Sequence, residues 1–269
     1  MDIIEPLLKW AGGKRWLVKI IKNIIPEVIS FENYTFVELF AGGAAFSFKN
    51  ELKDVVLNDI NPHLINFYFH LSKGRSIFDA NIEFLNDKDI YYKNRERFND
   101  LIKKSEHNTL EAAALFYYLN KTGYNGLIRF NKSGLFNVPF GRYKRINYFF
   151  DVSKYYNLIK KWRFFNLDFS KVPISSNSLV YADPPYDVEF TQYSSNTFDW
   201  KEQVRLAEYL TTLKVPVILS NQATERIIKL YSKLGYKLFF EDTTRYISCK
   251  GKREKAKEVI ALLNFDKGT

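Results

Sequence analysis

The sequence predicts a doubly wound α/β sheet, on the strength of three observations. Short apolar runs typical of buried strands alternate with segments of helical periodicity. Two of the strands end in a glycine pair or a proline pair, residues that form tight turns. Some 120 residues separate the second strand from the third, too many for one crossover, so the fold is expected to carry an insert.

The first half of the predicted sheet contains three strands. Residues 33–40, NYTFVELF, form a buried strand, followed by the loop AGG and a helical segment at 44–52. Residues 53–59, KDVVLND, form the second strand. The third strand, SLVYADPPY at 178–186, ends in two prolines, which fix two backbone φ angles and remove two backbone donors.

The remaining elements continue the alternation of helix and strand. A helix is expected at 200–213, a strand at 215–221 and a second helix at 224–235, closed by Gly235. Two further strands are expected at 236–242 and 258–265. This alternation is what favours a doubly wound sheet over an all-helical or all-strand fold.

The insert divides into a helical part and a basic, aromatic part. Residues 62–118 are rich in helical patterns, whereas residues 112–150 hold no Asp or Glu, six basic residues and eleven aromatic residues. Basic side chains neutralise phosphates and aromatic rings stack on bases, so this window predicts a nucleic-acid-binding insert, although many of its rings are also expected in the core. The predicted division is a catalytic domain at 1–61 and 150–269, with a target-recognition insert at 62–149.

Composition limits the classes of protein to which the chain can belong. The net charge of +10, with a pI near 9.3, favours a polyanionic partner over an ordinary basic protein. No apolar run approaches the roughly 18 residues that span a bilayer, and the N-terminus lacks a signal-peptide pattern, so a cytoplasmic protein is expected. The single cysteine, Cys249, excludes an internal disulfide, and no H-E-x-x-H pattern is present, so no metal site is expected.

Three of the predicted strands end in features that suit a nucleoside cofactor. The loop ELFAGG follows the first strand, Asp59 ends the second, and YADPPYD ends the third. In open α/β sheets ligands bind at the carboxyl ends of strands, and an acid at this position reaches ribose hydroxyls. The G-x-G-x-x-G fingerprint is absent, which favours S-adenosylmethionine over NAD. Each feature also has a structural alternative: a glycine turn, a helix cap at Asp59, and a proline stop.

Seven motifs occur in one order over nearly the whole chain: LLKWAGGK, FVELFAGGAAF, LNDIN, KTGYNGLIRFNKSGLFNVPFGRYK, YADPPY, ILSN and RYISCKGKR. In these motifs the sequence resembles the Dam-type DNA adenine N6-methyltransferases, which modify GATC. The resemblance implies a Rossmann-like methyltransferase sheet with a largely helical DNA-recognition insert. It also implies S-adenosylmethionine as the cofactor, double-stranded DNA as the partner and, as a further possible partner, a restriction endonuclease acting on the same site.

The resemblance assigns catalytic and cofactor-binding roles by position. The catalytic turn is Asp183, Pro184, Pro185 and Tyr186. Cofactor binding is assigned to Trp10, Ala11, Gly12 and Lys14, to Phe40, Ala41, Gly42 and Gly43, to Asp59 and Ile60, to Asp168 and Phe169, and to Asp183.

The same resemblance assigns the reading of DNA. Lys9 is expected at the first base pair with Tyr143 nearby, and Arg129 at the fourth pair, where the alternative is a phosphate contact. Leu127 and Pro139 are expected at the thymine methyl of the third pair. The remaining DNA-binding residues are Tyr124 and Asn125, which would fill the space of a flipped adenine, together with Asn131 and Arg142.

Two alternatives to an adenine methyltransferase remain open at the level of sequence. An acceptor turn of this kind also suits methylation of cytosine N4, of an RNA adenine or of a glutamine amide. A catalytically silent nucleic-acid-binding protein is the alternative from another class, and the intact carboxylate and cofactor loop argue against it.

Overall fold

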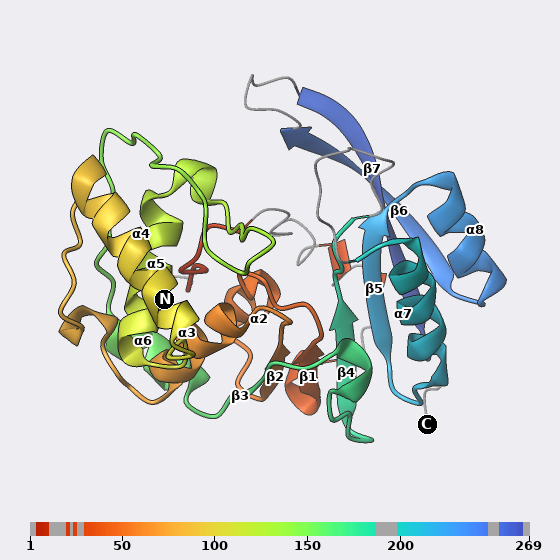
Figure 1. Cartoon of the computed structure of the whole chain (residues 1–269). Coiled ribbons are helices and arrows are strands. Elements are labelled where there is room, and N and C mark those ends of the chain that lie inside the picture. Colours follow the sequence, from red (N-terminus) through yellow and green to blue (C-terminus); the bar gives the residue numbers. More distant parts are fainter. Residues whose placement is uncertain are drawn as a thin grey trace. The chain divides into compact units, whose positions relative to one another are not determined.

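The computed structural model describes residues 4–10, 20–21, 24–25, 30–186, 198–246 and 253–265 (Figure 1). The chain forms two compact units. One consists of residues 1–19 with 41–167, and the other of residues 20–40 with 168–269. The candidate cofactor residues Ala11, Gly12 and Lys14 lie outside the described residues, as does Cys249.

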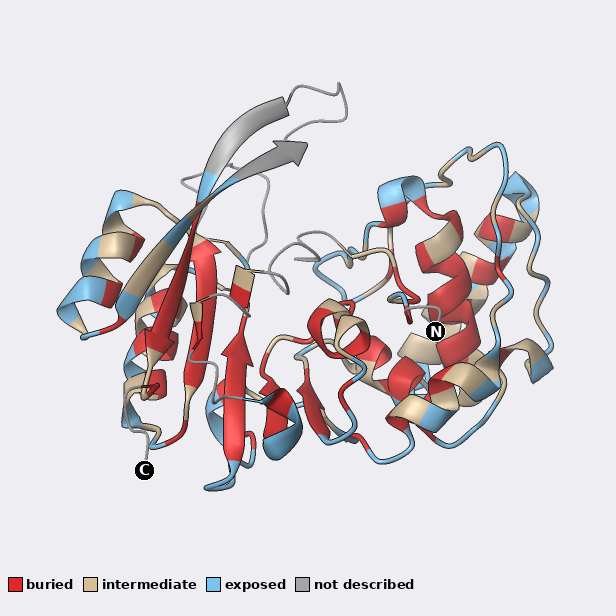
Figure 2. Cartoon of the chain, turned by 180° about the vertical axis from the view of Figure 1, so that it is seen from behind, coloured by how far each residue is buried: buried red, intermediate tan, exposed pale blue. Residues whose placement is uncertain are grey.

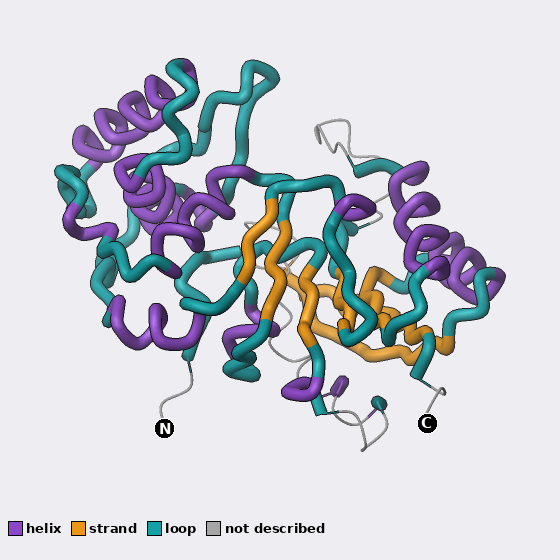
Figure 3. The backbone as a smooth tube through the Cα atoms, turned by 90° about the horizontal axis from the view of Figure 1, so that it is seen from below, coloured by secondary structure: helices purple, strands orange, loops and turns teal. Residues whose placement is uncertain are grey.

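Seven strands form one mixed sheet in the order β3-β2-β1-β4-β5-β7-β6. Figure 3 draws the strands in orange and the helices in purple. The predicted α/β fold class is confirmed. The pairs β2–β3, β1–β4 and β4–β5 are parallel, whereas β7 runs antiparallel to both β5 and β6. The strands are β1 (Thr35–Glu38), β2 (Val55–Asn58), β3 (Arg163–Phe165), β4 (Ser178–Ala182), β5 (Val217–Gln222), β6 (Lys237–Tyr246) and β7 (Arg253–Leu263).

The unit that contains β1 and β4–β7 builds its core from strands that are buried on both faces. Every residue of β1 and β4 is buried, as expected for central parallel strands (Figure 2). The unit also contains α7 (Trp200–Thr212) and α8 (Glu225–Lys233), with short 3-10 turns η1 (Phe31–Asn33) and η4 (Phe169–Lys171). Thr224 caps the N-terminus of α8. Gly235, with φ of +81°, follows its last turn as the sequence predicts.

The other unit is largely helical and confirms the helical patterns of residues 62–118. Its central helix, α5, is buried along nearly its whole length and packs against α3 and α4. Besides β2 and β3, the unit contains α2 (Ala45–Lys49), α3 (Pro62–Ser72), η2 (Ile77–Asp79), α4 (Lys88–Lys103), α5 (Leu110–Thr122), η3 (Tyr124–Gly126) and α6 (Val152–Ile159). Asn61, Asp87, Thr109 and Asp151 cap the N-termini of α3, α4, α5 and α6.

Many aromatic residues of the acid-free window belong to the core of this helical unit. Phe116, Tyr117 and Tyr118 on α5 are fully buried, and so is Phe136. Tyr124, in contrast, is 37% exposed, so only part of the aromatic content is available for a ligand. The unit also contains residues 41–61 and 150–167, so it extends beyond the predicted insert at 62–149.

The described part of the chain contains no helix that is long and apolar enough to cross a membrane. Nor do the described residues bring together three or more His, Cys, Asp or Glu side chains that could hold a metal ion.

His63 on α3 predicts a loss of stability in mild acid. The ring stacks on Phe130 at 5.1 Å, and burial lowers its pKa from 6.5 to about 4, with His107 as a smaller cause. Because the folded protein favours the neutral His63 ring, the ring contributes its full stabilisation of the fold above pH 6.5, the pKa in the unfolded chain. This contribution is lost as the pH falls towards 4, the pKa in the folded protein. The expected loss is about 3 kcal/mol.

Urea unfolding at several pH values between 7 and 4 measures this loss. The variant His63→Phe keeps a ring among the same aromatic neighbours and cannot titrate, so its stability should fall by about 3 kcal/mol less than that of the wild type. If the free energy of unfolding of both proteins fell equally between pH 7 and 4, the loss could not be assigned to His63.

Candidate active site

The predicted catalytic turn leaves the sheet directly after β4. The register pairs Glu38 of β1 with Tyr181 of β4, so both strands end at the same edge of the sheet. Asp183 is partly buried there, and its Oδ1 accepts a hydrogen bond from the Ser220 hydroxyl at 3.1 Å. Pro184 is buried and Pro185 is exposed. The Asp183 carboxylate is thus oriented by a neighbouring strand, β5.

Two more side chains hold the turn from behind. The Gln203 amide nitrogen on α7 donates to the carbonyl oxygen of Pro185 at 2.7 Å. The Tyr186 hydroxyl donates to Oε1 of Glu258 on β7 at 3.2 Å, and Glu258 is only 3% exposed. Sequence reasoning missed all three anchoring residues. The motif ILSN was a signal for Ser220, because it places polar residues at the end of an apolar strand.

Asp59 anchors the loop that follows β1. Its Oδ2 accepts a hydrogen bond from the Gly42 N–H at 3.0 Å, and its Oδ1 accepts one from the Asn61 N–H at 2.9 Å. Burial raises the pKa of Asp59, and these two hydrogen bonds oppose that rise. The suggestion that Asp59 caps the next helix is wrong, because the Asn61 side chain caps α3. Asp59 instead ties the glycine loop to the end of β2.

The glycine loop packs directly on Trp10. Gly42 has φ of +48°, and a Cβ at this position would lie 2.6 Å from Nε1 of Trp10, so no larger residue fits. The Tyr68 hydroxyl donates to the Gly43 carbonyl at 3.1 Å. Trp10, Ala41, Gly42, Gly43 and Asp59, which the resemblance assigns to cofactor binding, therefore cluster within one unit. Ile60, beside them in sequence, is 72% exposed.

Asp168 and Phe169 form a second cluster, with Arg205, in the other unit. The Arg205 guanidinium donates to both carboxylate oxygens of Asp168, at 2.9 and 2.7 Å, and lies 3.9 Å from the centre of the Phe169 ring. These hydrogen bonds hold the pKa of Asp168 far below its usual range. The Phe40 ring lies 5.7 Å from Phe169. Sequence reasoning did not find Arg205, whose partner lies 37 residues away.

The candidate DNA-reading residues lie on two joined loops of the helical unit. The Tyr124 N–H donates to the Pro139 carbonyl at 2.8 Å, which holds the loop after α5 against the loop at 139–143. Asn125 has φ of +53°, and Leu127 is 39% exposed. Arg129 is exposed and donates through Nε to Oδ1 of Asn137 at 2.7 Å. Tyr124, Asn125, Leu127, Arg129 and Pro139 are all exposed, whereas Lys9 and Tyr143 are half-buried.

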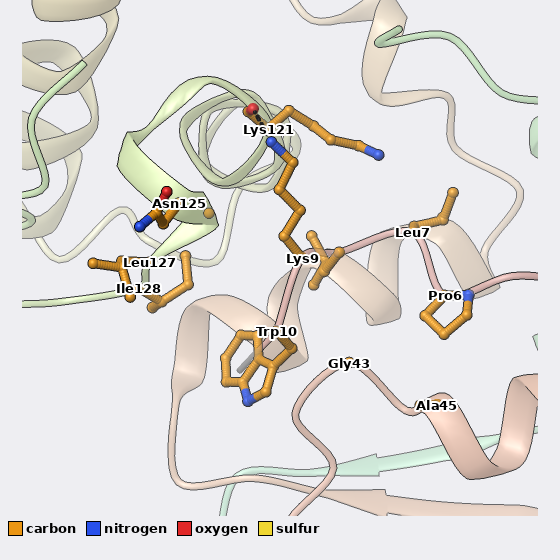
Figure 4. Close-up of a pocket in the computed structure, with 12 residues that line it drawn as sticks. Pro6, Leu7, Lys9, Trp10, Gly43, Ala45, Lys121, Asn125, Leu127 and Ile128 are labelled. Atoms are coloured by element: carbon orange, nitrogen blue, oxygen red, sulfur yellow. Dashed lines mark hydrogen bonds between the residues drawn. The ribbon is translucent and has the colours of Figure 1, made fainter. Parts of the chain in front are cut away.

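Lys9 and Tyr143 contact each other beside these loops. The Lys9 ammonium lies 3.7 Å from the centre of the Tyr143 ring and donates to the Lys121 carbonyl at 2.8 Å. The Asn120 side chain bonds both the N–H and the C=O of Lys9, at 2.8 Å each. A cavity of about 620 Å³ opens here (Figure 4), lined in part by Lys9, Trp10, Gly43, Asn125 and Leu127. Cofactor-loop and DNA-reading candidates thus line one cavity.

Asn131 and Arg142 have different surroundings. The Asn131 side chain accepts hydrogen bonds from the N–H groups of Ser133 and Leu135, at 3.0 Å each, so it shapes its own loop. Arg142 is exposed with φ of +51°. Both remain candidates for DNA contact.

Comparison with known proteins agrees with the resemblance found in the sequence. Residues 10–247 match the family model of the D12 class N6 adenine-specific DNA methyltransferases. The Type II methyltransferase M.CviBI of Paramecium bursaria Chlorella virus NC1A is 37% identical over 87% of this chain and 88% of its own length. The Type II methyltransferase M.MjaIII of Methanocaldococcus jannaschii is 34% identical over 94% of this chain and 96% of its own length.

The DNA adenine methylase of Escherichia coli strain K12 is 35% identical over 95% of this chain and 94% of its own length. The predicted recognition as an adenine-specific DNA methyltransferase is therefore confirmed, and the chain belongs to the D12 class N6 adenine-specific DNA methyltransferase family.

Proposed function

We propose that this DNA adenine methyltransferase uses S-adenosylmethionine to methylate the adenine of GATC in duplex DNA, after flipping that adenine out of the helix. The observation that supports the proposal most is the turn Asp183–Tyr186. It follows a buried strand at the ligand-binding edge of the sheet, and side chains from β5, α7 and β7 contact three of its four residues.

The proposed chemistry explains why the turn has these residues. The lone pair of the adenine amino nitrogen is delocalised into the ring, which makes the nitrogen a poor nucleophile. Asp183 accepts one N6 hydrogen bond and the Pro184 carbonyl accepts the other, which favours a pyramidal nitrogen with an available lone pair. Positive charge develops on this nitrogen in the transition state, and preorganised acceptors stabilise it. Tyr186 stacks on the target base.

The residues present suit S-adenosylmethionine, which supplies an electrophilic methyl group when bound. In one unit, Trp10, Gly42, Gly43 and Asp59 form an anchored loop in which Gly42 lacks the Cβ that would strike Trp10. In the other unit, Phe40 and Phe169 supply aromatic faces, and Asp168 is held by Arg205. Oδ1 of Asp168 already accepts from Arg205 and from the N–H and hydroxyl groups of Ser170, whereas Oδ2 accepts from Arg205 and keeps a lone pair for another donor, such as a nucleoside amino group.

Asp59→Ala should weaken the binding of S-adenosylmethionine at least tenfold. It removes the proposed ribose acceptor, and hydrogen bonds to charged groups contribute about 1.5–3 kcal/mol each. It also removes the acceptor of the Gly42 and Asn61 N–H groups, so the loop should loosen. Calorimetry measures the affinity, and DNA binding should not change.

Asp54→Ala is the matched control, because Asp54 is an exposed acid close to Asp59 in sequence that pairs with Arg163. Equal cofactor affinity in the two variants would contradict a cofactor-binding role for Asp59.

The proposed reading of GATC uses the exposed loops of the helical unit, within the proposed recognition insert at 62–149. A base inside duplex DNA is out of reach of the turn, so the adenine must be extruded, and Tyr124 and Asn125 would fill its place. Lys9 with Tyr143 would read the first pair and Arg129 the fourth, because both pairs contain guanine. Leu127 and Pro139 would contact the thymine methyl of the third pair.

Sequencing that detects modified bases tests the function directly. The chain is expressed in a host without adenine methylation, and the genomic DNA is sequenced with detection of N6-methyladenine and its context. Modification at GATC is the expected result. N4-methylcytosine, or N6-methyladenine in another context, would overturn the proposed base or the proposed site.

A further inference from the structure

We infer that Gln203 is a positioning residue that holds the catalytic turn in its working conformation. Gln203 lies on α7, is 1% exposed and bonds the Pro185 carbonyl at 2.7 Å. This inference rests on the proposed role of Asp183–Tyr186 in catalysis. Gln203 itself touches neither the target base nor the cofactor in that proposal.

The turn needs an anchor from outside because two of its four residues are prolines. Pro184 and Pro185 have no N–H group, so neither can be fixed through a backbone donor of its own. Their φ angles are locked and Pro185 also restricts ψ of Pro184, but ψ of Pro185 stays free and decides where the Pro185 carbonyl points. Ser220 holds Asp183 at one side, and Gln203 holds the Pro185 carbonyl at the other. Between these two anchors lies the Pro184 carbonyl, the proposed second acceptor for N6.

The orientation of the Gln203 amide is set by a second buried amide. Nδ2 of Asn221 on β5 donates to Oε1 of Gln203 at 2.9 Å and to the Tyr231 hydroxyl at 3.1 Å. Asn221 is fully buried. Because Oε1 accepts from Asn221, the Gln203 nitrogen must face Pro185. If the Gln203 amide were reversed, Oε1 would face the Pro185 carbonyl oxygen and Nε2 would face Nδ2 of Asn221, so neither contact could be a hydrogen bond.

The position of Gln203 on α7 also argues for a role beyond packing. The other buried residues of this helix are Leu206, Ala207 and Leu210. A buried amide among apolar side chains costs free energy unless it is hydrogen-bonded, and an apolar residue would avoid that cost. The amide is satisfied here only through the turn and Asn221 among the residues that the structure describes. Gln203 therefore connects the helix and β5 to the catalytic turn.

The test compares single-turnover methyl transfer in the wild type and Gln203→Met. Methionine resembles glutamine in length and flexibility but cannot donate to Pro185. We expect the rate constant to fall about ten- to hundredfold, because a displaced reacting group is costly. The affinities for S-adenosylmethionine and for a GATC duplex should stay within twofold of wild type. Tyr231→Phe is the matched control, because it removes a hydroxyl from the same network but leaves the link from Asn221 through Gln203 to Pro185 intact.

A second variant, Gln203→Glu, separates positioning from packing by its pH profile. A protonated carboxylic acid can donate to Pro185 and accept from Asn221 as glutamine does, whereas the carboxylate cannot donate. The rate of this variant relative to wild type should therefore rise as the pH falls. A purely structural role predicts a constant ratio, once both proteins are shown by melting curves to be folded throughout the range.

The outcomes distinguish this inference from the function on which it rests. Suppose first that Asp183→Ala is inactive, so that the catalytic turn stands. The positioning role is then wrong if Gln203→Met keeps the wild-type rate, or if Tyr231→Phe loses as much rate as Gln203→Met. If Asp183→Ala itself keeps the wild-type rate, the turn is not catalytic and both proposals fall. The inference is supported if Gln203→Met loses methyl-transfer rate and if the rate of Gln203→Glu relative to wild type rises as the pH falls.

Discussion

Asp183→Ala should lower the single-turnover rate of methyl transfer by about a thousandfold or more. The change removes a charged acceptor aimed at the position where positive charge develops. Removing one neutral group from a preorganised site costs about 10²–10³ in rate, and a charged group makes the stronger hydrogen bond. The side chain is only partly buried, so the cavity left behind is small and the fold should persist. The rate is measured with radiolabelled S-adenosylmethionine and a GATC duplex in excess of both dissociation constants.

Two measurements keep this prediction specific to catalysis. The affinity for DNA should change little, because the lost interaction with the target nitrogen belongs to the transition state. Asp183→Asn retains a neutral oxygen acceptor and the contact with Ser220, so it should fall between wild type and Asp183→Ala. A near wild-type rate in Asp183→Ala would remove the turn from the mechanism.

The sheet was predictable where its strands are central and buried. The runs at 33–40, 53–59, 178–186 and 215–221 all contain strands, because a strand buried on both faces is predominantly apolar. The strand β3 was missed, since Arg163–Phe165 has three residues and no measurable period. The hairpin of β6 and β7 extends well past the predicted ranges, to Tyr246 and back to Arg253. Its outer arms are polar in sequence, so the apolar pattern ends before the strands do.

The site was predictable at the turns and not at the residues that support them. Asp59 and Asp183 stand at strand ends in short recognisable motifs, and Asp59 accepts a hydrogen bond from the Gly42 N–H of the glycine loop. Their roles in cofactor binding and catalysis stay predictions. Gln203, Arg205 and Glu258 lie in a helix or strand with no local signal of their own. Their partners are distant in sequence, so only the tertiary fold brings them to Pro185, Asp168 and Tyr186.

In the candidate DNA-reading loops, too, the sequence does not show which side chains are exposed. The composition of residues 112–150 predicts a nucleic-acid-binding surface, but it does not say which of these residues point outward. The structure buries Phe136 and Val138 and leaves Arg129 and Pro139 exposed. It also shows that Asn137 orients Arg129 through Oδ1 at 2.7 Å and through its carbonyl at 3.2 Å. A guanidinium held in this way is suited to a contact of fixed direction.

Arg129→Ala should relax specificity at the fourth pair of GATC and leave the other three pairs unaffected. A bidentate contact between arginine and guanine contributes about 1–3 kcal/mol of discrimination, which corresponds to about 5- to 150-fold in the ratio of rates on correct and substituted sites. Two of the five N–H groups of Arg129 donate to Asn137, and the described residues offer the others no partner. Those N–H groups suffice for a bidentate contact.

The measurement is the methylation rate on a panel of duplexes that carry each single substitution of GATC, for wild type and Arg129→Ala. Asn137→Ala leaves the arginine in place and removes the Oδ1 acceptor but not the carbonyl, so it should show a smaller loss of discrimination at the same pair. If Arg129 contacts only phosphate, every duplex should be methylated more slowly by about the same factor, and the salt dependence of binding should weaken. That pattern would reject base reading by Arg129, and a wild type that is indifferent to the fourth pair would reject GATC itself.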